Sequence, residues 1–221
     1  MKSAVKNIRL PLWLATLIAV VLTLAQHQVL ADQEPHAVIE AVTKKVLDDI
    51  GSYREALREA SDNSEKDARM TEFFGKLQDT LEPVVDFRWI ALNVMGNHRQ
   101  KATPEQQERF REVFTQALVE TYGRGLLSYS GQQIVVVPPS EPAADQRRVT
   151  VRQEIHSDDG RIPLLYSMGA SRSGDWKVVN VIINGINLGT TFRNQFAQAY
   201  NRYGGDIDRV VDNWAVQNPD N

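Results

Sequence analysis

The spacing of the apolar residues changes near Gly131, and this change constrains the fold more than any other feature of the chain. Before Gly131, apolar residues recur every three or four positions, as on one face of an α-helix. After it come four segments rich in β-branched and aromatic residues, separated by turn-forming residues. The order predicts an α+β fold, in which N-terminal helices pack on a C-terminal, mostly antiparallel sheet of four to five strands.

Helical spacing covers residues 35–60, 65–81 and a segment from Phe87 that stops at Gly96. The clearest helix start is the sequence from Thr103 to Gln106, where Thr103 can cap the helix and Gln106 can return a hydrogen bond to the cap. Pro104 suits the first helical position. We predict a long helix from there to near Tyr129, a helix from Gly189 to Gly204, and a short last helix carrying Ile207, Val210, Val211 and Trp214.

The expected strands are residues 133–137, 147–155, 161–170 and 175–184. An Asp-Gly pair at Gly160 separates the second strand from the third and is typical of a hairpin turn. The fourth strand is apolar on both faces, so we expect it to lie centrally. The second strand alternates, with Val149, Val151 and Ile155 on one face and Thr150, Arg152 and Glu154 on the other, which indicates that one side of the sheet meets solvent.

Residues 1–31 have the order of a secretory signal peptide, since basic residues precede an apolar run over 10–25. We expect cleavage after Ala31, because Val29 and Ala31 supply small side chains before the cut. The alternative is an uncleaved membrane anchor, although the run is shorter than the ~20 residues that span a bilayer. An exported protein is therefore expected, with a single domain over residues 32–216 and a flexible tail at 217–221.

The composition excludes several kinds of chemistry. The chain has no cysteine, which rules out disulfides and thiolate metal sites. Its net charge of −3 becomes more acidic once the basic N-terminal residues are removed, which argues against nucleic acid as a partner. The histidines lack the spacing of metal ligands, and no Gly-x-Ser-x-Gly motif is present. We expect a protein that is not an enzyme and that holds no metal and no cofactor.

Two other functions fit the same pattern of elements. One is an enzyme on a similar cone-shaped scaffold of the nuclear-transport-factor-like (NTF2-like) group, which would need a buried ionisable group such as a His-Asp pair. His156 is the plausible histidine on a strand, and alternation places it opposite Val149, Val151 and Ile155, toward water. The other is a periplasmic adaptor with a solid core that binds only protein.

Three stretches together resemble the MlaC family of periplasmic phospholipid-binding proteins, also known from toluene-tolerance operons. They are residues 85–88 leading to Gly96, residues 102–106 with Phe110, Phe114, Leu118 and Tyr122, and residues 176–181 continuing through 185–188 to 192–196. The sequence differs from the family pattern at Asn180, where the family often has an acidic residue, and at Asn187, where it often has serine.

The resemblance implies a cone-shaped, NTF2-like domain whose hydrophobic cavity takes acyl chains while the headgroup stays near solvent. It also implies a monomer that carries phospholipid as cargo between an outer-membrane lipoprotein complex and an inner-membrane MCE-domain ABC transporter, which maintains outer-membrane lipid asymmetry. A diacyl lipid has about 30 methylenes worth ~0.8 kcal/mol each, so its bare passage through water would cost on the order of 25 kcal/mol. An apolar lining can offset that cost without any catalytic group.

On this basis we expect large apolar side chains from both helices and strands to line the cavity. Arg88, Arg99 and Arg193 are candidates to approach a phosphate at its mouth. The expected lining is Phe87, Ile90, Phe110, Phe114 and Leu118 from the helices, Val149, Val151, Leu165, Tyr166, Met168, Trp176, Val178, Val181 and Ile183 from the sheet, and Phe192 and Phe196 as its closure.

Overall fold

The structure is a computed structural model that describes residues 34–139, 146–158 and 160–215. The predicted signal peptide with its cleavage site and the predicted tail lie outside the described residues. The elements are α2 (Pro35–Glu59), α3 (Asn63–Leu81), α4 (Phe87–Met95), the 3-10 helix η1 (Gly96–Gln100), α5 (Pro104–Leu126), β1 (Gln133–Val136), β2 (Arg148–Ser157), β3 (Gly160–Ala170), β4 (Trp176–Ile183), β5 (Ile186–Asn187), α6 (Leu188–Arg202) and α7 (Ile207–Asp212). The predicted α+β class, with helices packed on an antiparallel sheet, is confirmed.

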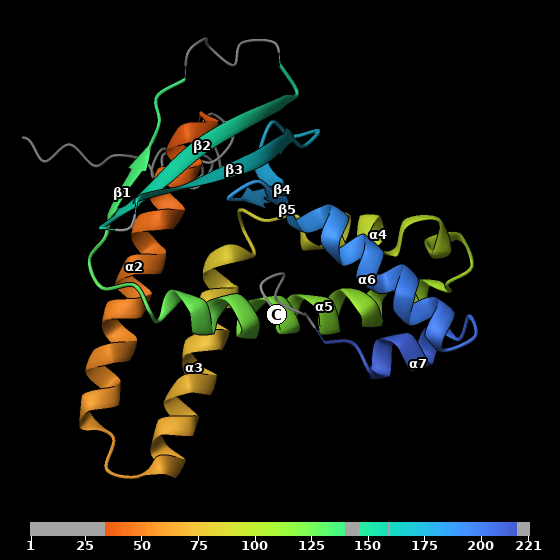
Figure 1. Cartoon of the computed structure of the whole chain (residues 1–221), viewed down its shortest axis with the longest axis horizontal. Coiled ribbons are helices and arrows are strands. Elements are labelled where there is room, and N and C mark those ends of the chain that lie inside the picture. Colours follow the sequence, from red (N-terminus) through yellow and green to blue (C-terminus); the bar gives the residue numbers. More distant parts are fainter. Residues whose placement is uncertain (1–33, 140–145, 159, 216–221) are drawn as a thin grey trace, which may run out of the picture.

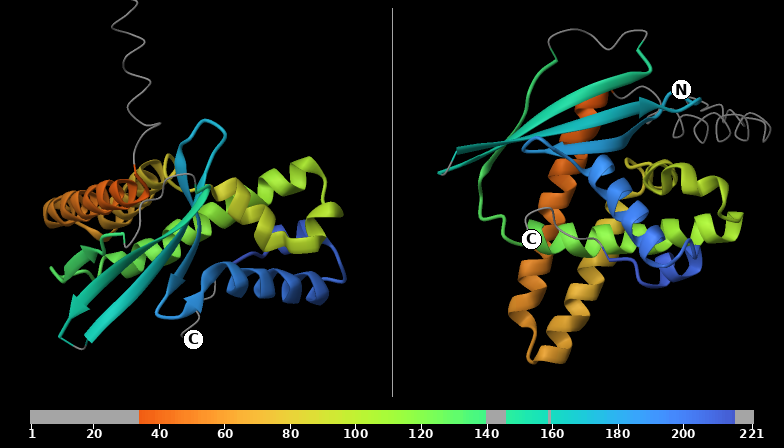
Figure 2. Two further views of the ribbon diagram at one scale, coloured as in Figure 1. Left: turned by 90° about the horizontal axis from the view of Figure 1, so that it is seen from above. Right: turned by 45° about the vertical axis from the view of Figure 1, so that its right-hand side comes forward.

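The five strands form one antiparallel sheet in the order β1-β2-β3-β4-β5. In Figure 1 the sheet lies above helices α3 and α5, and α2 runs downward from it. Viewed from above in Figure 2, the strands cross the molecule with α2 and α3 toward one end and α4, α6 and α7 toward the other. Among the described helices, none is both long enough and apolar enough to cross a bilayer.

One face of the sheet is apolar and packs on the start of α2. Its core is the sheet cluster, which comprises Val38 and Ile39 of α2 with Val151, Met168 and Val178 of the strands. Val151 and Met168 are completely buried. The predicted alternation of β2 is therefore confirmed, since Thr150 and Arg152 are exposed on the opposite face. We call these two surfaces the apolar face and the polar face.

A β-bulge in β4 interrupts the alternation of the sheet. Ser167 pairs with Asn180, whereas Met168 pairs with Val178, so Val179 is the additional residue. A bulge turns two successive side chains toward one side. Val179 lies over Gly169, where a Cβ would be 3.4 Å from its Cγ1. Val179 and Asn180 thus both belong to the polar face, while Val178 and Val181 both reach the apolar face.

A second core lies among α4, α5, α6 and α7. Its aromatic rings pack closely: the ring centroid of Phe110 is 5.5 Å from that of Phe114 and 4.9 Å from that of Phe196. Phe114 in turn contacts Phe192 at 5.5 Å. Trp214 follows α7 rather than lying within it, but its ring contacts Phe110 at 5.1 Å. We call this group the aromatic cluster.

Helices α2 and α3 form an antiparallel pair with a third core of their own, the hairpin cluster, built on Ile50, Tyr53, Phe73, Leu77 and Val119 of α5. A buried polar contact accompanies it. The Thr80 hydroxyl donates to Oδ2 of Asp49 at 2.7 Å, and Lys76 Nζ lies 3.2 Å from the other carboxylate oxygen. The carboxylate of Asp49 is 3% exposed, so both contacts are needed to satisfy it.

Signals in the local sequence correctly predicted most of the boundaries of the helices and strands. The predicted capping box is confirmed, since Thr103 Oγ1 accepts from the amide of Gln106 at 3.2 Å and Gln106 Oε1 accepts from the amide of Thr103 at 3.0 Å. Helix α5 ends at Leu126, before the predicted Tyr129.

Strand β4 is not central: beyond it lie only the two residues of β5 and a bridge from Val178 to Val85. Helix α6 also packs there, which explains why both faces of β4 are apolar.

Candidate functional site

The apolar face of the sheet is closed at one end and open at the other. Towards the β2–β3 hairpin, Ile155, Leu164 and Ile183 are only half-buried, and Ile162 is 39% exposed. Register places Ile155 opposite Ile162 and Leu164 opposite Ile183, so these four side chains form a continuous apolar strip. None of them belongs to the three clusters formed by the described residues.

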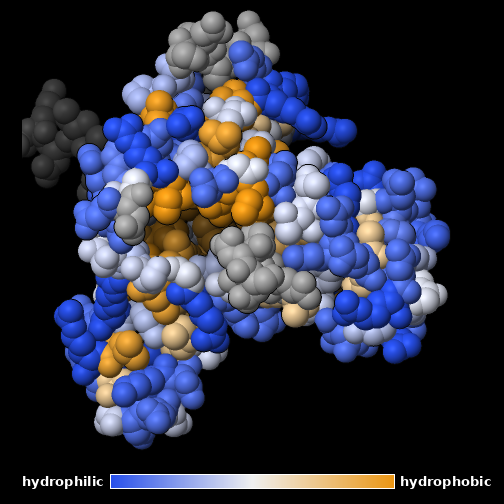
Figure 3. Space-filling model, viewed as in Figure 1, coloured by the Kyte–Doolittle hydropathy of each residue, from blue (hydrophilic) through white to orange (hydrophobic). Residues whose placement is uncertain are grey.

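The side of the molecule below the sheet is hollowed. Figure 3 shows the hollow between the sheet and the helices beneath it, with hydrophobic side chains gathered around it. The apolar strip belongs to the face of the sheet that is turned toward these helices. Apolar groups left half-exposed beside a hollow are typical of a site that binds an apolar ligand.

A row of polar side chains crosses the apolar face where the sheet cluster meets the apolar strip. Gln153 Nε2 donates to Thr43 Oγ1 on α2 at 2.8 Å, and the Tyr166 hydroxyl donates to Gln153 Oε1 at 2.8 Å. Gln153 is 3% exposed. Burial raises the pKa of Tyr166 well above its ordinary value, so the phenol remains a hydrogen-bond donor throughout the physiological range.

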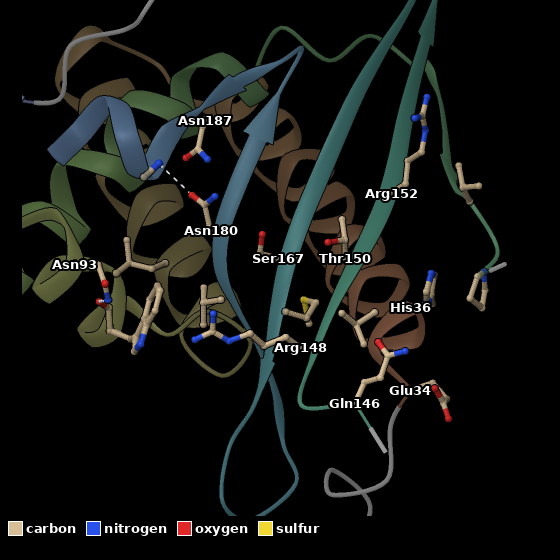
Figure 4. A pocket seen from close by; sticks show the side chains of 18 of the residues that line it. Glu34, His36, Asn93, Gln146, Arg148, Thr150, Arg152, Ser167, Asn180 and Asn187 are labelled. Carbon is tan, nitrogen blue, oxygen red and sulfur yellow. Dashed lines mark hydrogen bonds between the residues drawn. The ribbon is translucent and has the colours of Figure 1, made fainter. Parts of the chain in front are cut away.

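An open pocket of about 1350 Å³ lies over the polar face of the sheet. Its floor includes Thr150, Ser167 and Asn180, which register places side by side on β2, β3 and β4 (Figure 4). Its walls come from α4, from the start of α6, from the start of α2 and from the segment after β1. Arg193 Nε donates to the carbonyl oxygen of Asn93 at 2.9 Å and joins the α6 and α4 walls.

The pocket is lined by three arginines and by two glutamates, Glu34 and Glu40. Arg152 is paired with Glu154 at 2.8 Å, whereas Arg148 has no ion pair among the described residues. Arg193 is the third, and of the three arginines expected near a phosphate it alone lines the pocket. Guanidinium groups that are free or held by carbonyl oxygens can bind a phosphate or a carboxylate.

Glu154 is the centre of a charged group on the polar face. Its carboxylate lies 3.0 Å from His156 Nε2, 2.8 Å from Arg152 and 3.7 Å from Arg161. The hydrogen bond from His156, followed by that from Arg152, lowers the pKa of Glu154. His156 thus lies on the polar face, as its alternation predicted, and away from the apolar strip. The described residues contain no group of three or more side chains that could hold a metal ion.

The structure distributes the expected lining residues over several places. The interior of the aromatic cluster is filled by the packed rings of Phe110, Phe114, Phe192 and Phe196. At its edge lie Ile90 and Leu118. Phe87 is buried at the start of α4. The sheet cluster contains Val151, Met168 and Val178, with Val149, Tyr166, Trp176 and Val181 around it.

Two of the expected lining residues lie elsewhere. Ile183 belongs to the apolar strip, and Leu165 lies on the polar face, because it alternates with Tyr166 on β3. The sequence reasoning did not select Ile162 or Leu164, and it did not include Ile155, although all three alternate in step with Tyr166 or Val151. It also missed Gln153, whose signal was a polar residue at a position where the alternation requires an apolar one.

Fold and site together define an α+β domain whose antiparallel sheet and helices border an apolar hollow, an arrangement typical of small domains that bind apolar ligands. A family model described as "MlaC protein" matches residues 52–216. The chain belongs to the MlaC family, and the resemblance seen in its three sequence stretches is confirmed.

Individual relatives agree with this family. The chain is 37% identical to the toluene tolerance protein ttg2D of Pseudomonas putida over 84% of this chain and 81% of that protein. It is 23% identical to the intermembrane phospholipid transport system binding protein MlaC of Haemophilus influenzae, over 82% of each. A solved phospholipid-binding protein from Ralstonia solanacearum, in complex with a phospholipid, superposes with a TM-score of 0.69 at 27% identity, over 81% of this chain and 94% of that one.

Proposed function

We propose that this chain is a periplasmic phospholipid carrier. It shelters the acyl chains of one phospholipid in the hollow below the sheet and passes the lipid between an outer-membrane lipoprotein complex and an inner-membrane MCE-domain ABC transporter. By doing so it helps to maintain the lipid asymmetry of the outer membrane. It acts as a monomer, and its chemistry needs neither a cofactor nor a catalytic group.

The observation that carries this proposal is the apolar strip. Ile155, Ile162, Leu164 and Ile183 are the continuation of a face that is fully buried at Val151 and Met168, yet no core cluster of the described residues covers them. Each methylene placed against such a surface gains about 0.8 kcal/mol relative to water. A surface of this kind stabilises acyl chains by contact alone.

The relatives support the same function. The solved Ralstonia solanacearum protein is a phospholipid-binding protein in complex with a phospholipid, and it shares the fold over most of both chains. The Haemophilus influenzae relative is a binding protein of an intermembrane phospholipid transport system. Transfer between two membranes requires a carrier that crosses the aqueous space between them, which agrees with the expected export of this chain.

The test is native mass spectrometry of the protein purified without detergent from cells that express the full sequence. A carrier retains phospholipid, which appears as a mass increment that is lost after solvent extraction, and the extract contains a diacyl phospholipid. Protein that is empty in every preparation, and that takes up no lipid from phosphatidylglycerol vesicles, would contradict the proposal.

Export is tested in the same cells. The periplasmic fraction should contain the protein with an intact mass that begins at Asp32, as expected for cleavage after Ala31. Retention of the uncleaved chain in the membrane fraction would favour the membrane-anchor alternative instead. Size-exclusion chromatography with light scattering then measures whether the processed chain is a monomer.

A further inference from the structure

The polar row formed by Thr43, Gln153 and Tyr166 is unusual because it lies within a face that is otherwise apolar. Its members come from three different elements, α2, β2 and β3, and two hydrogen bonds of 2.8 Å join them. Gln153 is almost completely buried. Buried amides are normally kept where they satisfy other polar groups, and in this row the three side chains satisfy one another.

The position of the row coincides with the change from closed core to open strip. On β2, Gln153 lies between Val151, which is fully buried, and Ile155, which is half-buried. On β3, Tyr166 lies between Met168, which is fully buried, and Leu164, which is half-buried. Register places Gln153 opposite Leu164 and Tyr166 opposite Val151, so the hydrogen bond between Gln153 and Tyr166 runs diagonally across the two strands where the face changes from buried to accessible.

Helix α2 shows the same boundary. Thr43 lies between Ile39, which belongs to the sheet cluster, and Val46 and Ile50, which belong to the hairpin cluster or pack on it. The row therefore ties α2 to the sheet at the junction of two cores. Beyond it, toward the β2–β3 hairpin, the sheet offers the apolar strip.

We propose that the polar row is the floor of the acyl site and limits the length of the acyl chains that the protein accepts. This inference rests on the proposed function. An acyl chain lying along the strip reaches the row with its terminal methyl group. To advance further it would have to separate Gln153 from its partners and leave buried polar groups without hydrogen bonds, which costs more than the burial of one further methylene gains.

The main test removes the polar groups of the row while keeping side chains of similar volume. The variant Thr43→Val, Gln153→Met and Tyr166→Phe replaces all partners together, so no polar group is left unsatisfied. The matched control is Arg161→Met with Lys177→Met, which removes two polar side chains from β3 and β4 on the polar face, outside the pocket. Each protein is incubated with vesicles that contain equal amounts of dimyristoyl and distearoyl phosphatidylglycerol, and the bound lipid is identified by mass spectrometry.

The ratio of bound distearoyl to dimyristoyl lipid should rise about tenfold in the triple variant, as expected when roughly one net hydrogen bond no longer opposes the longer chain. The control should keep the wild-type ratio. A second variant, Ile155→Gln, moves the polar boundary one position outward along β2 and should shift the ratio the other way. It carries the test by itself should the triple variant fail to fold, as judged by circular dichroism.

The outcomes separate this inference from the function on which it rests. Lipid bound at an unchanged chain-length ratio in both variants overturns the inference while the carrier function stands. Wild-type protein that binds neither lipid overturns the carrier function and the inference with it. Opposite shifts of the ratio in the two variants, with no shift in the control, support the proposal that the polar row is the floor of the acyl site.

Discussion

The backbone amide of Gly189 donates a hydrogen bond to the side-chain oxygen of Asn180, at an N···O distance of 3.0 Å (Figure 4). The bond joins the polar face of β4 to the first turn of α6. A Cβ atom on residue 189 would lie 2.6 Å from that same oxygen, closer than real Cβ atoms approach. Asn180 therefore holds the start of α6 against the sheet, and it does so only because residue 189 is glycine.

The substitution Gly189→Ala should therefore destabilise the fold by about 2 kcal/mol, through loss of this hydrogen bond and displacement of the helix start. Urea unfolding followed by circular dichroism measures the change. Gly75→Ala is the matched control, since it lies within α3 with open space around it and should stabilise the protein by about 0.5–1 kcal/mol. Equal effects of the two substitutions would contradict this role of Asn180.

Removing the buried carboxylate of Asp49 should lower stability without changing lipid content. Asp49→Ala leaves the Thr80 hydroxyl without its acceptor between α2 and α3, at a cost of about 2 kcal/mol. Lys76→Met should also cost about 1–2 kcal/mol, because it leaves the other oxygen of a carboxylate that is only 3% exposed without its cation. Thermal unfolding gives the stabilities, and native mass spectrometry shows whether the phospholipid remains.

Two neighbouring isoleucines on β4 test the apolar strip directly. Ile183 lies on the apolar face and Ile182 on the polar face, yet the two are consecutive and both half-buried. Ile183→Asp should reduce bound phospholipid about tenfold, since a carboxylate beside the acyl chains must either be desolvated or exclude them. Ile182→Asp should retain nearly the wild-type amount. Equal retention in both proteins would show that the strip does not contact lipid.

The acid side of the stability curve should depend on Glu154. Hydrogen bonds from His156 and Arg152 lower its pKa from the ordinary 4.5 in the folded chain. A carboxyl group with a depressed folded pKa stabilises the fold above its unfolded pKa, and that contribution is lost as the pH falls through the folded value. Carboxyl carbon NMR should show Glu154 titrating below 4.5, and His156→Ala should move its pKa upward. A midpoint at or above 4.5 in the wild type would contradict this account.

The sequence predicted the elements of this fold because its signals are local. The capping box at Thr103 and the alternation about Val151 each depend on neighbours within a few residues, and both are confirmed. The position of β4 depends on contacts distant in sequence, such as the bridge from Val178 to Val85, and the prediction that it is central was wrong.

The site was harder to predict for a related reason. Apolar periodicity describes which side chains leave the solvent, but it cannot distinguish a residue that packs against protein from one that borders a hollow. Phe110 and Ile183 carry the same kind of signal, yet one is enclosed by other aromatic rings and the other belongs to the apolar strip. Only the arrangement of the helices around the sheet separates the two.

Helix α2 takes part in two cores, contacting the sheet through Ile39 and α3 through Ile50. Its 25 residues make a rod about 37 Å long, so a tilt of about 5° at the sheet displaces the far end by about 3 Å. The turn that joins α2 to α3 therefore amplifies any change in the tilt of α2 that a ligand beneath the sheet causes. A fluorophore attached at Ser61 would report cargo entry as a change in its distance from the sheet.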